Sequence, residues 1–168
     1  MRRHQREEEF TRFFAEHGPG LRRTASYMLR DWHLAEDLTQ QALVKLYGAW
    51  ARTRPETRVA FARKIVVNEC LSHLRRHRLE TSLPQVQEDA APVPQDVLDL
   101  DAALALLPPR QRAIIALRYL DDLTIAEVGR LLNIADGTVK SQSARALETL
   151  RAHLPEFCTA ITAPQEAR

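Results

Sequence analysis

The sequence has little of what β structure and phosphate-binding loops require. Glycine accounts for only 5 of the 168 residues, and neither a β-hairpin signal nor a Gly-rich phosphate loop occurs. Aromatic residues make up 6% of the chain against 45% for all hydrophobic residues, so the core must be mostly aliphatic. No cluster of Asp, His or Ser has the arrangement of a catalytic site. We therefore expect an all-α protein that is not an enzyme.

Cysteine is scarce, and long hydrophobic runs are missing. The two cysteines, Cys70 and Cys158, lie in different halves, and neither a signal peptide nor an apolar run long enough to span a bilayer is present. This predicts a reduced, cytoplasmic protein without membrane insertion. Cys70, His73 and His77 would share about 60° of a helix face. Because no fourth ligand lies close in sequence, we interpret them as packing residues and expect neither metal nor cofactor.

Charge and proline divide the chain. Residues 1 to 80 contain 16 Lys+Arg against 10 Asp+Glu, whereas residues 81 to 168 contain 8 against 12. The basic excess predicts a surface that faces a polyanion in the first half. The stretch Glu80 to Gln95 has three prolines and few large apolar residues, which is typical of a linker. We therefore expect two small helical domains joined by a flexible Pro-rich linker.

The stretch Leu123 to Leu154 carries two helical patterns joined by a short corner. Thr124 and Glu127 have the spacing of a capping box at the start of the first helix. Gly129 permits close approach of a partner helix, Asn133 tolerates the left-handed backbone of the corner, and Asp136 can cap the second helix. These features predict a helix-turn-helix.

The second of these helices is amphipathic. At 100° per residue its buried arc comprises Val139, Ser143, Ala146, Leu147, Leu150 and Leu154. The opposite face carries Thr138, Ser141, Gln142, Arg145 and Thr149, with Lys140 and Arg151 on one flank. Such residue types contact base edges and phosphates in a major groove, so the helix can read DNA. The alternative is a solvated amphipathic helix.

The first half predicts three helices. In the first, from Glu8 to Arg30, the segment Gly18-Pro19-Gly20 predicts a break or kink. Asp31 is a candidate cap for the second, which extends through Trp50. Its core stripe comprises Leu34, Leu38, Ala42, Leu46 and Ala49. Its other face interleaves polar and apolar side chains, namely Glu36, Asp37, Gln40, Gln41, Leu43, Val44 and Tyr47. This mixture indicates a protein-binding surface or, alternatively, packing on a third helix.

Residues 51–60, with Arg52, Arg54 and Arg58, are predicted to form an exposed loop whose partner is phosphate. In the third helix, Phe61 to Arg78, the buried arc comprises Ala62, Val66, Val67, Cys70, Leu71 and Leu74. Lys64, Asn68 and Arg75 project together from the far side. This ridge suits a nucleic-acid strand, although basic helix ends are often merely solvated.

After the linker, a leucine-rich helix precedes Pro108-Pro109, and Pro109 can occupy the first turn of a helix from Arg110 to Leu120. The second domain is thus a unit of about four helices that ends with the DNA-reading one. The sequence does not decide whether the tail after Leu154 frays or packs back.

Four stretches of the chain resemble one protein family. They read HLAEDLTQQALVKLYGAW, FARKIVVNECLSHLRR, LPPRQRAIIALRYLDDLTIAEVGRLLNI and DGTVKSQSARALETLR, and they cover most of residues 8 to 154. Their order and the linker between them resemble the RNA polymerase sigma factors of the extracytoplasmic-function (ECF) group, the small two-domain members of the sigma-70 family. Departures occur at Gln41, Leu43, Asn133 and Ser143, where Glu, an aromatic residue, Gly and a larger apolar residue are common.

The resemblance implies a transcription initiation factor that binds RNA polymerase core, reads the −35 and −10 promoter elements and promotes strand opening. It implies a region 2-like domain over residues 1–80, a linker over 81–95, a region 4-like domain over 96–155 and a tail over 156–168. The implied partners are promoter DNA, the largest-subunit clamp helices and the flap of the polymerase, with an anti-sigma factor as a candidate. The free protein is expected to be a monomer.

The resemblance also assigns roles to individual positions. The implied polymerase-binding residues are Asp37, Leu38, Gln40, Gln41 and Val44. The implied −10 residues are Arg52, Arg54, Lys64, Asn68 and Arg75. The implied −35 residues are Thr138, Lys140, Ser141, Gln142 and Arg145. The competing hypotheses are a stand-alone helix-turn-helix repressor or activator, which would normally dimerise, and a metal-dependent or redox sensor that uses Cys70.

Overall fold

The computed structural model describes residues 3–80 and 95–162, which are helical and contain no strand. The predicted all-α class is therefore confirmed for these residues. The chain divides into a first unit, Met1–Glu80, and a second unit, Thr81–Arg168, and each is described by itself. The predicted linker lies outside the described residues, except for Gln95, at which the second unit's first helix begins.

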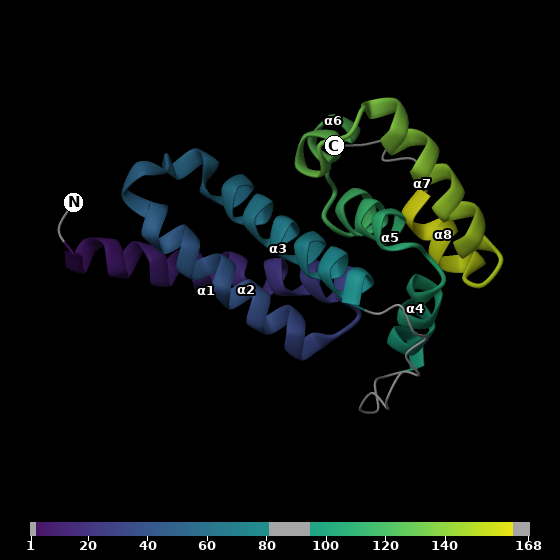
Figure 1. Cartoon of the computed structure of the whole chain (residues 1–168), viewed down its shortest axis with the longest axis horizontal. Helices are drawn as coiled ribbons and strands as arrows, with labels where there is room; N and C mark the ends of the chain where they lie inside the picture. The colour runs from purple at the N-terminus through teal and green to yellow at the C-terminus, as the bar shows by residue number, and fades with distance from the viewer. Residues whose placement is uncertain (1–2, 81–94, 163–168) are drawn as a thin grey trace. The chain divides into compact units, whose positions relative to one another are not determined.

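The first unit contains three long helices that pack against one another (Figure 1). They are α1 (Arg3–Leu29), α2 (Trp32–Ala49) and α3 (Arg58–Glu80), with two short 3₁₀ helices, η1 (Trp50–Arg52) and η2 (Pro55–Thr57), between α2 and α3. Asp31 caps α2 as predicted, since its Oδ1 accepts a hydrogen bond from the Leu34 N–H at 2.9 Å. Lys45 on α2 and Glu69 on α3 form an ion pair across the two helices.

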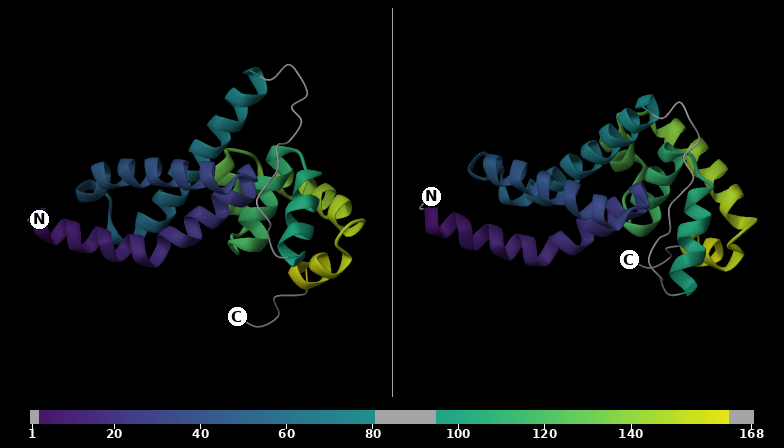
Figure 2. Two further views of the ribbon diagram at one scale, coloured as in Figure 1. Left: turned by 90° about the horizontal axis from the view of Figure 1, so that it is seen from below. Right: turned by 60° about the horizontal axis from the view of Figure 1, so that its bottom comes forward.

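Of the break or kink predicted in the first helix, the break does not occur. α1 runs continuously from Arg3 to Leu29 with Pro19 inside it, although its ribbon bends along its length (Figure 2). Proline removes one backbone hydrogen bond from the helix. Leu21, Ala25 and Met28 are nevertheless buried. Packing of that half of α1 on the other helices therefore keeps the helix intact and leaves only a bend.

The structure decides two further expectations for the first unit. The segment 51–60 exposes Arg52 and Arg54 as predicted but is not a loop throughout, because η1, η2 and the first residues of α3 occupy most of it. Leu43, placed on the mixed face of α2 with packing on a third helix as the alternative, is only 5% exposed. Leu43 instead belongs to the core, because three helices pack in this unit and α2 is covered on more than one side.

The second unit is built from shorter helices. They are α4 (Gln95–Ala105), α5 (Pro109–Ile115), the π-helical turn η3 (Ala116–Leu120), α6 (Ile125–Leu132), α7 (Asp136–Arg151) and α8 (Pro155–Thr162). Pro109 occupies the first turn of α5 as predicted. The described part of the tail, residues 155–162, packs back: α8 contacts α7, and Cys158 is buried with its Sγ 3.9 Å from the carbonyl oxygen of Leu147.

The helix-turn-helix is formed by α6 and α7. Both capping-box bonds are present: the Thr124 N–H donates to Glu127 Oε2 at 2.7 Å, and the Glu127 N–H donates to Thr124 Oγ1 at 3.2 Å. Asn133 adopts the left-handed conformation at φ 53°. A Cβ at Gly129 would lie 2.9 Å from the Ile134 carbonyl oxygen, so only glycine fits this corner. These three predictions are confirmed.

The predicted cap of the second helix is wrong by one residue. Ala135 is the N-cap of α7 and has no side-chain bond, whereas Asp136 is the first helical residue. The chain turns at Asn133 and reaches α7 one residue earlier than the capping pattern suggested. Asp136 can still stabilise α7, because a carboxylate in the first turn interacts favourably with the helix dipole.

Candidate polymerase and nucleic-acid interfaces

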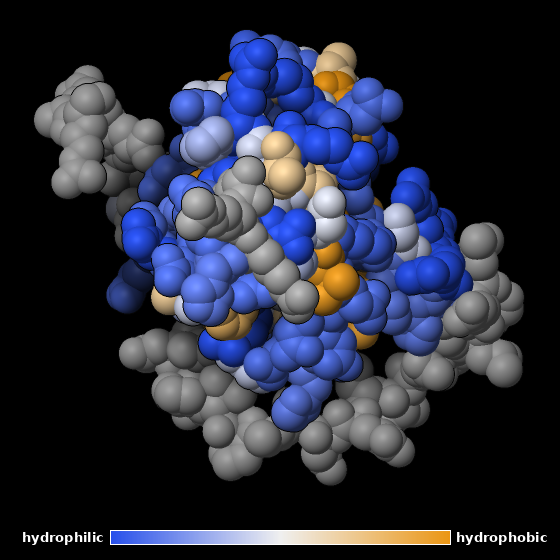
Figure 3. Space-filling view, turned by 90° about the vertical axis from the view of Figure 1, so that its left-hand side faces the viewer, coloured by the Kyte–Doolittle hydropathy of each residue, from blue (hydrophilic) through white to orange (hydrophobic). Residues whose placement is uncertain are grey.

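One face of α2 combines exposed polar and apolar side chains. Asp37, Gln40, Gln41 and Val44 are exposed, and Val44 is 72% exposed although it is aliphatic. At 100° per residue these positions share about 100° of the helix surface. An exposed aliphatic side chain between amides and a carboxylate is typical of a protein-binding surface. Figure 3 shows another aspect of the molecule, a face on which hydrophilic residues predominate.

Other α2 residues predicted for this surface are used inside the first unit. Leu38 is 5% exposed and lies in the core. Glu36 accepts a hydrogen bond from Arg22 at 3.2 Å. Tyr47 packs against Phe10, with ring centroids 5.0 Å apart. The candidate docking face therefore consists of the four exposed residues, and the alternative of packing on a third helix holds for Leu43 and Tyr47.

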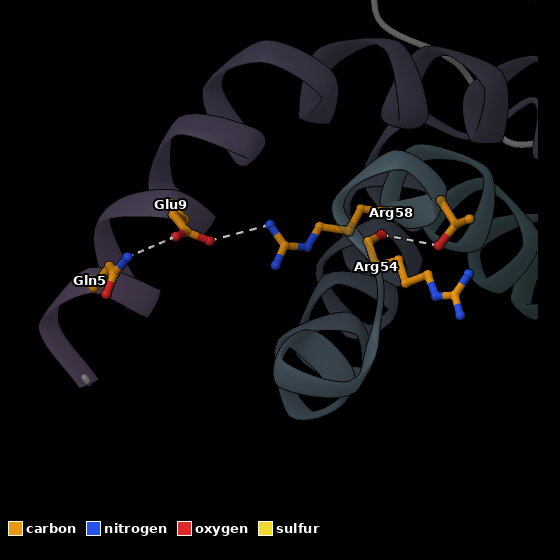
Figure 4. A network of polar contacts seen from close by, with 5 residues as sticks. Gln5, Glu9, Arg54 and Arg58 are labelled. Atoms are coloured by element: carbon orange, nitrogen blue, oxygen red, sulfur yellow. Dashed lines mark hydrogen bonds and ion pairs between the residues drawn. The ribbon is translucent and has the colours of Figure 1, made fainter. Parts of the chain in front are cut away.

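The three arginines between α2 and α3 have different environments. Arg52 and Arg54 are exposed. Arg58 is held inside the unit: its guanidinium lies 3.8 Å from the Trp50 ring centroid and pairs with Glu9 at 3.3 Å (Figure 4). The carbonyl oxygen of Arg54 accepts the Thr57 hydroxyl at 3.0 Å. Two outward-facing cations thus stand on a segment that Arg58 ties to α1.

An aromatic cluster packs against the segment between α2 and α3. Trp50 is 1% exposed, and its ring meets those of Phe10 and Phe13 edge-on at centroid distances of 5.1 and 5.3 Å. Arg6 adds a hydrogen bond to the Tyr47 hydroxyl at 3.1 Å. Edge-to-face pairs favour defined ring positions, so the cluster fixes where α2 ends. The sequence analysis assigned no role to the start of α1 and therefore missed Glu9.

A basic ridge runs along α3. Lys64, Asn68 and Arg75 are exposed and share one face, and Arg75 Nη2 donates to Ser72 Oγ at 3.1 Å. Phe61, which is 36% exposed, was not among the predicted site residues. Its spacing of three and seven residues before Lys64 and Asn68 would have revealed it. An exposed ring beside cations and an amide can stack an unpaired base.

The outer face of α7 is polar. Lys140, Ser141 and Arg145 are exposed, and Thr138 and Gln142 are partly exposed. The predicted buried arc is confirmed for Val139, Ser143, Ala146, Leu147 and Leu150. Gln142 is not isolated, because its Oε1 accepts a hydrogen bond from Gln111 Nε2 on α5 at 3.1 Å. No sequence pattern points to Gln111, since the two residues lie on different helices.

Comparisons with known proteins match both units to one family. The model described as "Sigma-70 region 2" matches residues 13–80, and "Sigma-70, region 4" matches residues 98–150. The chain is 33% identical over 144 residues to "ECF RNA polymerase sigma factor SigM" of Mycobacterium tuberculosis, which covers 82% of this chain and 72% of that protein. The chain belongs to the sigma-70 family. The ECF membership implied by the resemblance is confirmed.

Two further relatives support the assignment of this chain to the ECF sigma factors. The "RNA polymerase sigma-E factor" of Streptomyces coelicolor is 32% identical over 153 residues, covering 87% of this chain and 86% of that protein. Among solved structures, the sigma factor RpoE of Bartonella quintana, crystallised with the anti-sigma factor NepR, superposes with a TM-score of 0.76 at 25% identity. That alignment covers 89% of this sigma factor and 98% of the other chain.

Among the residues weighed for metal or redox chemistry, Cys70 lies inside the sigma factor's fold, His73 is partly exposed and His77 is exposed. Cys70 is fully buried, and burial raises the pKa of its thiol to about 12, so it stays protonated at neutral pH. Within residues 3–80 and 95–162, no group of three His, Cys, Asp or Glu side chains could hold a metal ion. None of the described helices is long and apolar enough to cross a membrane.

Proposed function

We propose that this sigma factor acts in the cytoplasm, binds RNA polymerase core through the first unit, and uses two separate DNA contacts to place the enzyme at promoters. The observation that carries the proposal is that each unit presents its own outward polar ridge: Lys64, Asn68 and Arg75 on α3, and Ser141 and Arg145 on α7. The family assignment makes DNA the natural partner of both ridges.

In the first unit, the mixed face of α2 is the proposed docking site for the clamp helices of the largest polymerase subunit. Its members are Asp37, Gln40, Gln41 and Val44, without the buried Leu38. Val44 is an exposed aliphatic side chain surrounded by hydrogen-bonding groups. This supports the role, because protein interfaces combine an apolar centre with a polar rim. Contact with the polymerase flap is proposed for the second unit.

The basic ridge of α3 and the exposed Arg52 and Arg54 are proposed to hold the single strand of the −10 element. The guanidinium groups attract phosphates, and Asn68 can both donate to and accept from a base. Phe61 is a candidate stacking platform for an unpaired base. Trapping bases once they have opened shifts the equilibrium towards the melted state, so opening requires no nucleotide hydrolysis by the sigma factor.

The second unit is proposed to read the −35 duplex through the outer face of α7. Thr138, Ser141, Gln142 and Arg145 occupy the centre of that face, and Lys140 lies on its flank, where it suits a phosphate. Joining a duplex contact and a single-strand contact in one chain increases the effective concentration of the second once the first has formed.

An anti-sigma factor is a proposed regulatory partner. The similar sigma factor RpoE of Bartonella quintana was crystallised with the anti-sigma factor NepR. A partner of this kind would hold the present chain, otherwise a monomer, away from core polymerase. Co-purification of the chain with core polymerase, in the presence and absence of such a partner, tests this competition directly.

Run-off transcription with purified bacterial core enzyme on genomic fragments tests the main proposal. We expect promoter-specific transcripts that depend on the chain, and weak promoter binding by the chain alone. A stand-alone helix-turn-helix regulator would behave differently: the chain alone would shift a palindromic duplex, and no specific transcript would appear. That pair of results would reject the sigma-factor activity proposed here.

Two substitutions separate the DNA contacts. Arg145→Ala should weaken closed-complex binding through the −35 element, whereas Asn68→Ala should permit the closed complex and impair opening. A lost polar base contact is worth about 1–3 kcal/mol. Permanganate footprinting reports the opened thymines, and equal melting by the Asn68→Ala and unsubstituted proteins would contradict the −10 assignment.

A further inference from the structure

Gln111 lies outside the predicted −35 residues but contacts one of them. It is the third residue of α5, which begins at Pro109, and its Nε2 donates to the Gln142 Oε1 at 3.1 Å. Both side chains are partly exposed at the edge where α5 packs against α7. The hydrogen bond is therefore part of the rim of the helix-turn-helix rather than of its core.

The backbone that carries Gln111 is held in place. The Arg112 N–H donates to the Pro108 carbonyl oxygen at 3.0 Å, and the Arg112 side chain is 7% exposed. Pro109 has a fixed φ in the first turn of the helix. Gln111 consequently projects from a rigid turn, and its Nε2 donates to the Gln142 Oε1 from there.

An amide side chain has an acceptor end and a donor end. The acceptor end of Gln142 is used by Gln111, whereas no hydrogen bond within residues 3–80 and 95–162 uses its Nε2 group. We infer that Gln111 is a specificity-determining positioning residue: it orients the Gln142 amide so that N–H donors, rather than the carbonyl oxygen, face the major groove.

This orientation selects among base edges and rests on the proposed −35 role of α7. Donors match the major-groove acceptors of guanine (N7 and O6), of thymine (O4) and of adenine (N7), whereas an outward carbonyl oxygen would match the amino groups of adenine and cytosine. A free glutamine would use both ends and pair with adenine. Gln142 therefore favours guanine or thymine over cytosine on the strand that it reads, and the hydrogen bond from Gln111 is the cause.

The substitution Gln111→Glu tests the inference by reversing the amide. A carboxylate only accepts, so Gln142 must turn its Nε2 towards residue 111 and present its oxygen to DNA. Glutamate in the first turn of a helix is favourable, so the fold is expected to persist. Gln111→Met is the second variant: it leaves the Gln142 amide free to turn, and the base preference should broaden.

The measurement uses holoenzyme reconstituted from bacterial core polymerase and the full chain. Double-stranded promoter fragments randomised over the −35 element are bound, and the bound fraction is sequenced. We expect Gln111→Glu to reverse the discrimination at one position, from guanine or thymine over cytosine to cytosine over guanine or thymine, by roughly tenfold, without changing the other positions. Because preferences are ratios, a uniform loss of affinity from the added charge does not affect them.

The Gln142→Ala background is the control. There, Gln111→Glu should leave all base preferences unchanged, because residue 111 acts only through residue 142. A shift that persists in this background, or no shift at all in a holoenzyme that selects a −35 sequence, overturns the inference. Failure of the proposed function gives a different result: the unsubstituted holoenzyme would select no −35 sequence, and both proposals would fall.

Discussion

The two units are stabilised in different ways. Of the ten aromatic residues, eight lie in the first 80 residues, and the rings of Phe10, Phe13, Tyr47 and Trp50 form one cluster with Arg6 and Arg58. In the described part of the second unit, the buried hydrophobic side chains are aliphatic, apart from Cys158. That unit relies on a capping box, a left-handed corner and one close approach at Gly129.

The two kinds of stabilisation match the backbone on which each unit carries its exposed polar side chains. Arg52 ends the 3₁₀ helix η1 and Arg54 is the extended residue before η2, so both lie on backbone with few hydrogen bonds of its own, which a side chain from α1 holds through Arg58. The polar face of α7 lies on a regular helix, and a correctly packed corner is sufficient to orient it. Each unit also has one buried cysteine, Cys70 or Cys158, and the alkylation rates of the two thiols can report opening of each unit separately.

Removal of the central ring should have the largest effect. Trp50→Ala deletes a side chain that is 1% exposed and contacts two aromatic rings and the Arg58 guanidinium. We expect the first unit to lose about 3–5 kcal/mol. Because burial raises the pKa of Cys70 to about 12, its reactive thiolate forms only when the unit opens. Alkylation of Cys70 should accelerate, and that of Cys158 should not.

A variant in which both thiols accelerate together would contradict the division into independently stabilised units. Leu150→Ala is the matched control, since Leu150 is fully buried in α7. It should accelerate alkylation of Cys158 alone, through the loss of about 2–5 kcal/mol from the second unit.

The corner of the helix-turn-helix should be the second most sensitive point. Gly129→Ala places a Cβ 2.9 Å from the Ile134 carbonyl oxygen, a backbone atom that cannot move without distorting the corner. We expect a loss of roughly 1–3 kcal/mol from the second unit, measured by urea unfolding. Gly137→Ala is the control: a Cβ there meets nothing within 4 Å, so this variant should gain about 0.4–1 kcal/mol. Equal effects of the two substitutions would show that crowding at the corner is not the cause.

The same contrast explains what the sequence could predict. Thr124, Glu127, Gly129 and Asn133 act on partners within a few residues, so their spacing alone identified the corner. The pattern could not place the cap exactly, because Asp136 and Ala135 differ by a single residue of turn geometry. Helical periodicity located the outward faces of α2, α3 and α7, because it depends only on spacing within one helix, and the family resemblance assigned roles to residues on those faces.

Contacts between residues far apart in the chain could not be predicted from sequence patterns. Glu9 and Arg58 are 49 residues apart, and Arg6 and Tyr47 are 41 apart, so periodicity within one helix contains no information about them. For the same reason the pattern left two alternatives for Leu43, an outward surface or packing on a third helix, and it did not decide between a break and a kink at Pro19 in a helix that tertiary packing keeps whole. Gln111 and Gln142, 31 residues apart, are the corresponding case in the second unit.

The ion pair that ties the basic segment to α1 should have a smaller effect. Glu9→Gln keeps the size of the side chain and removes the charge that Arg58 faces at 3.3 Å. We expect the first unit to lose about 1 kcal/mol at low salt, because Arg58 is largely buried while Glu9 is partly solvated. The loss should shrink in high salt. Glu8→Gln removes the same charge from an exposed neighbour, and an equal loss there would mean that net charge, not the pair, is responsible.

The smallest expected effect is a gain in the second unit. Ser143 is 7% exposed on the inward side of α7, and its Oγ has no hydrogen-bond partner among the described residues. A buried, unsatisfied hydroxyl costs free energy, and alanine is the better helix former, so Ser143→Ala should stabilise the unit by about 1 kcal/mol in urea unfolding. Ser141→Ala, on the same helix but exposed, should change stability by less than about 0.5 kcal/mol. Promoter binding should be weakened by Ser141→Ala and not by Ser143→Ala, because Ser141 lies on the proposed DNA surface and Ser143 faces the aliphatic core. A stability gain from Ser141→Ala as large as that from Ser143→Ala would show that helix propensity, rather than the burial of an unpaired hydroxyl, is the source.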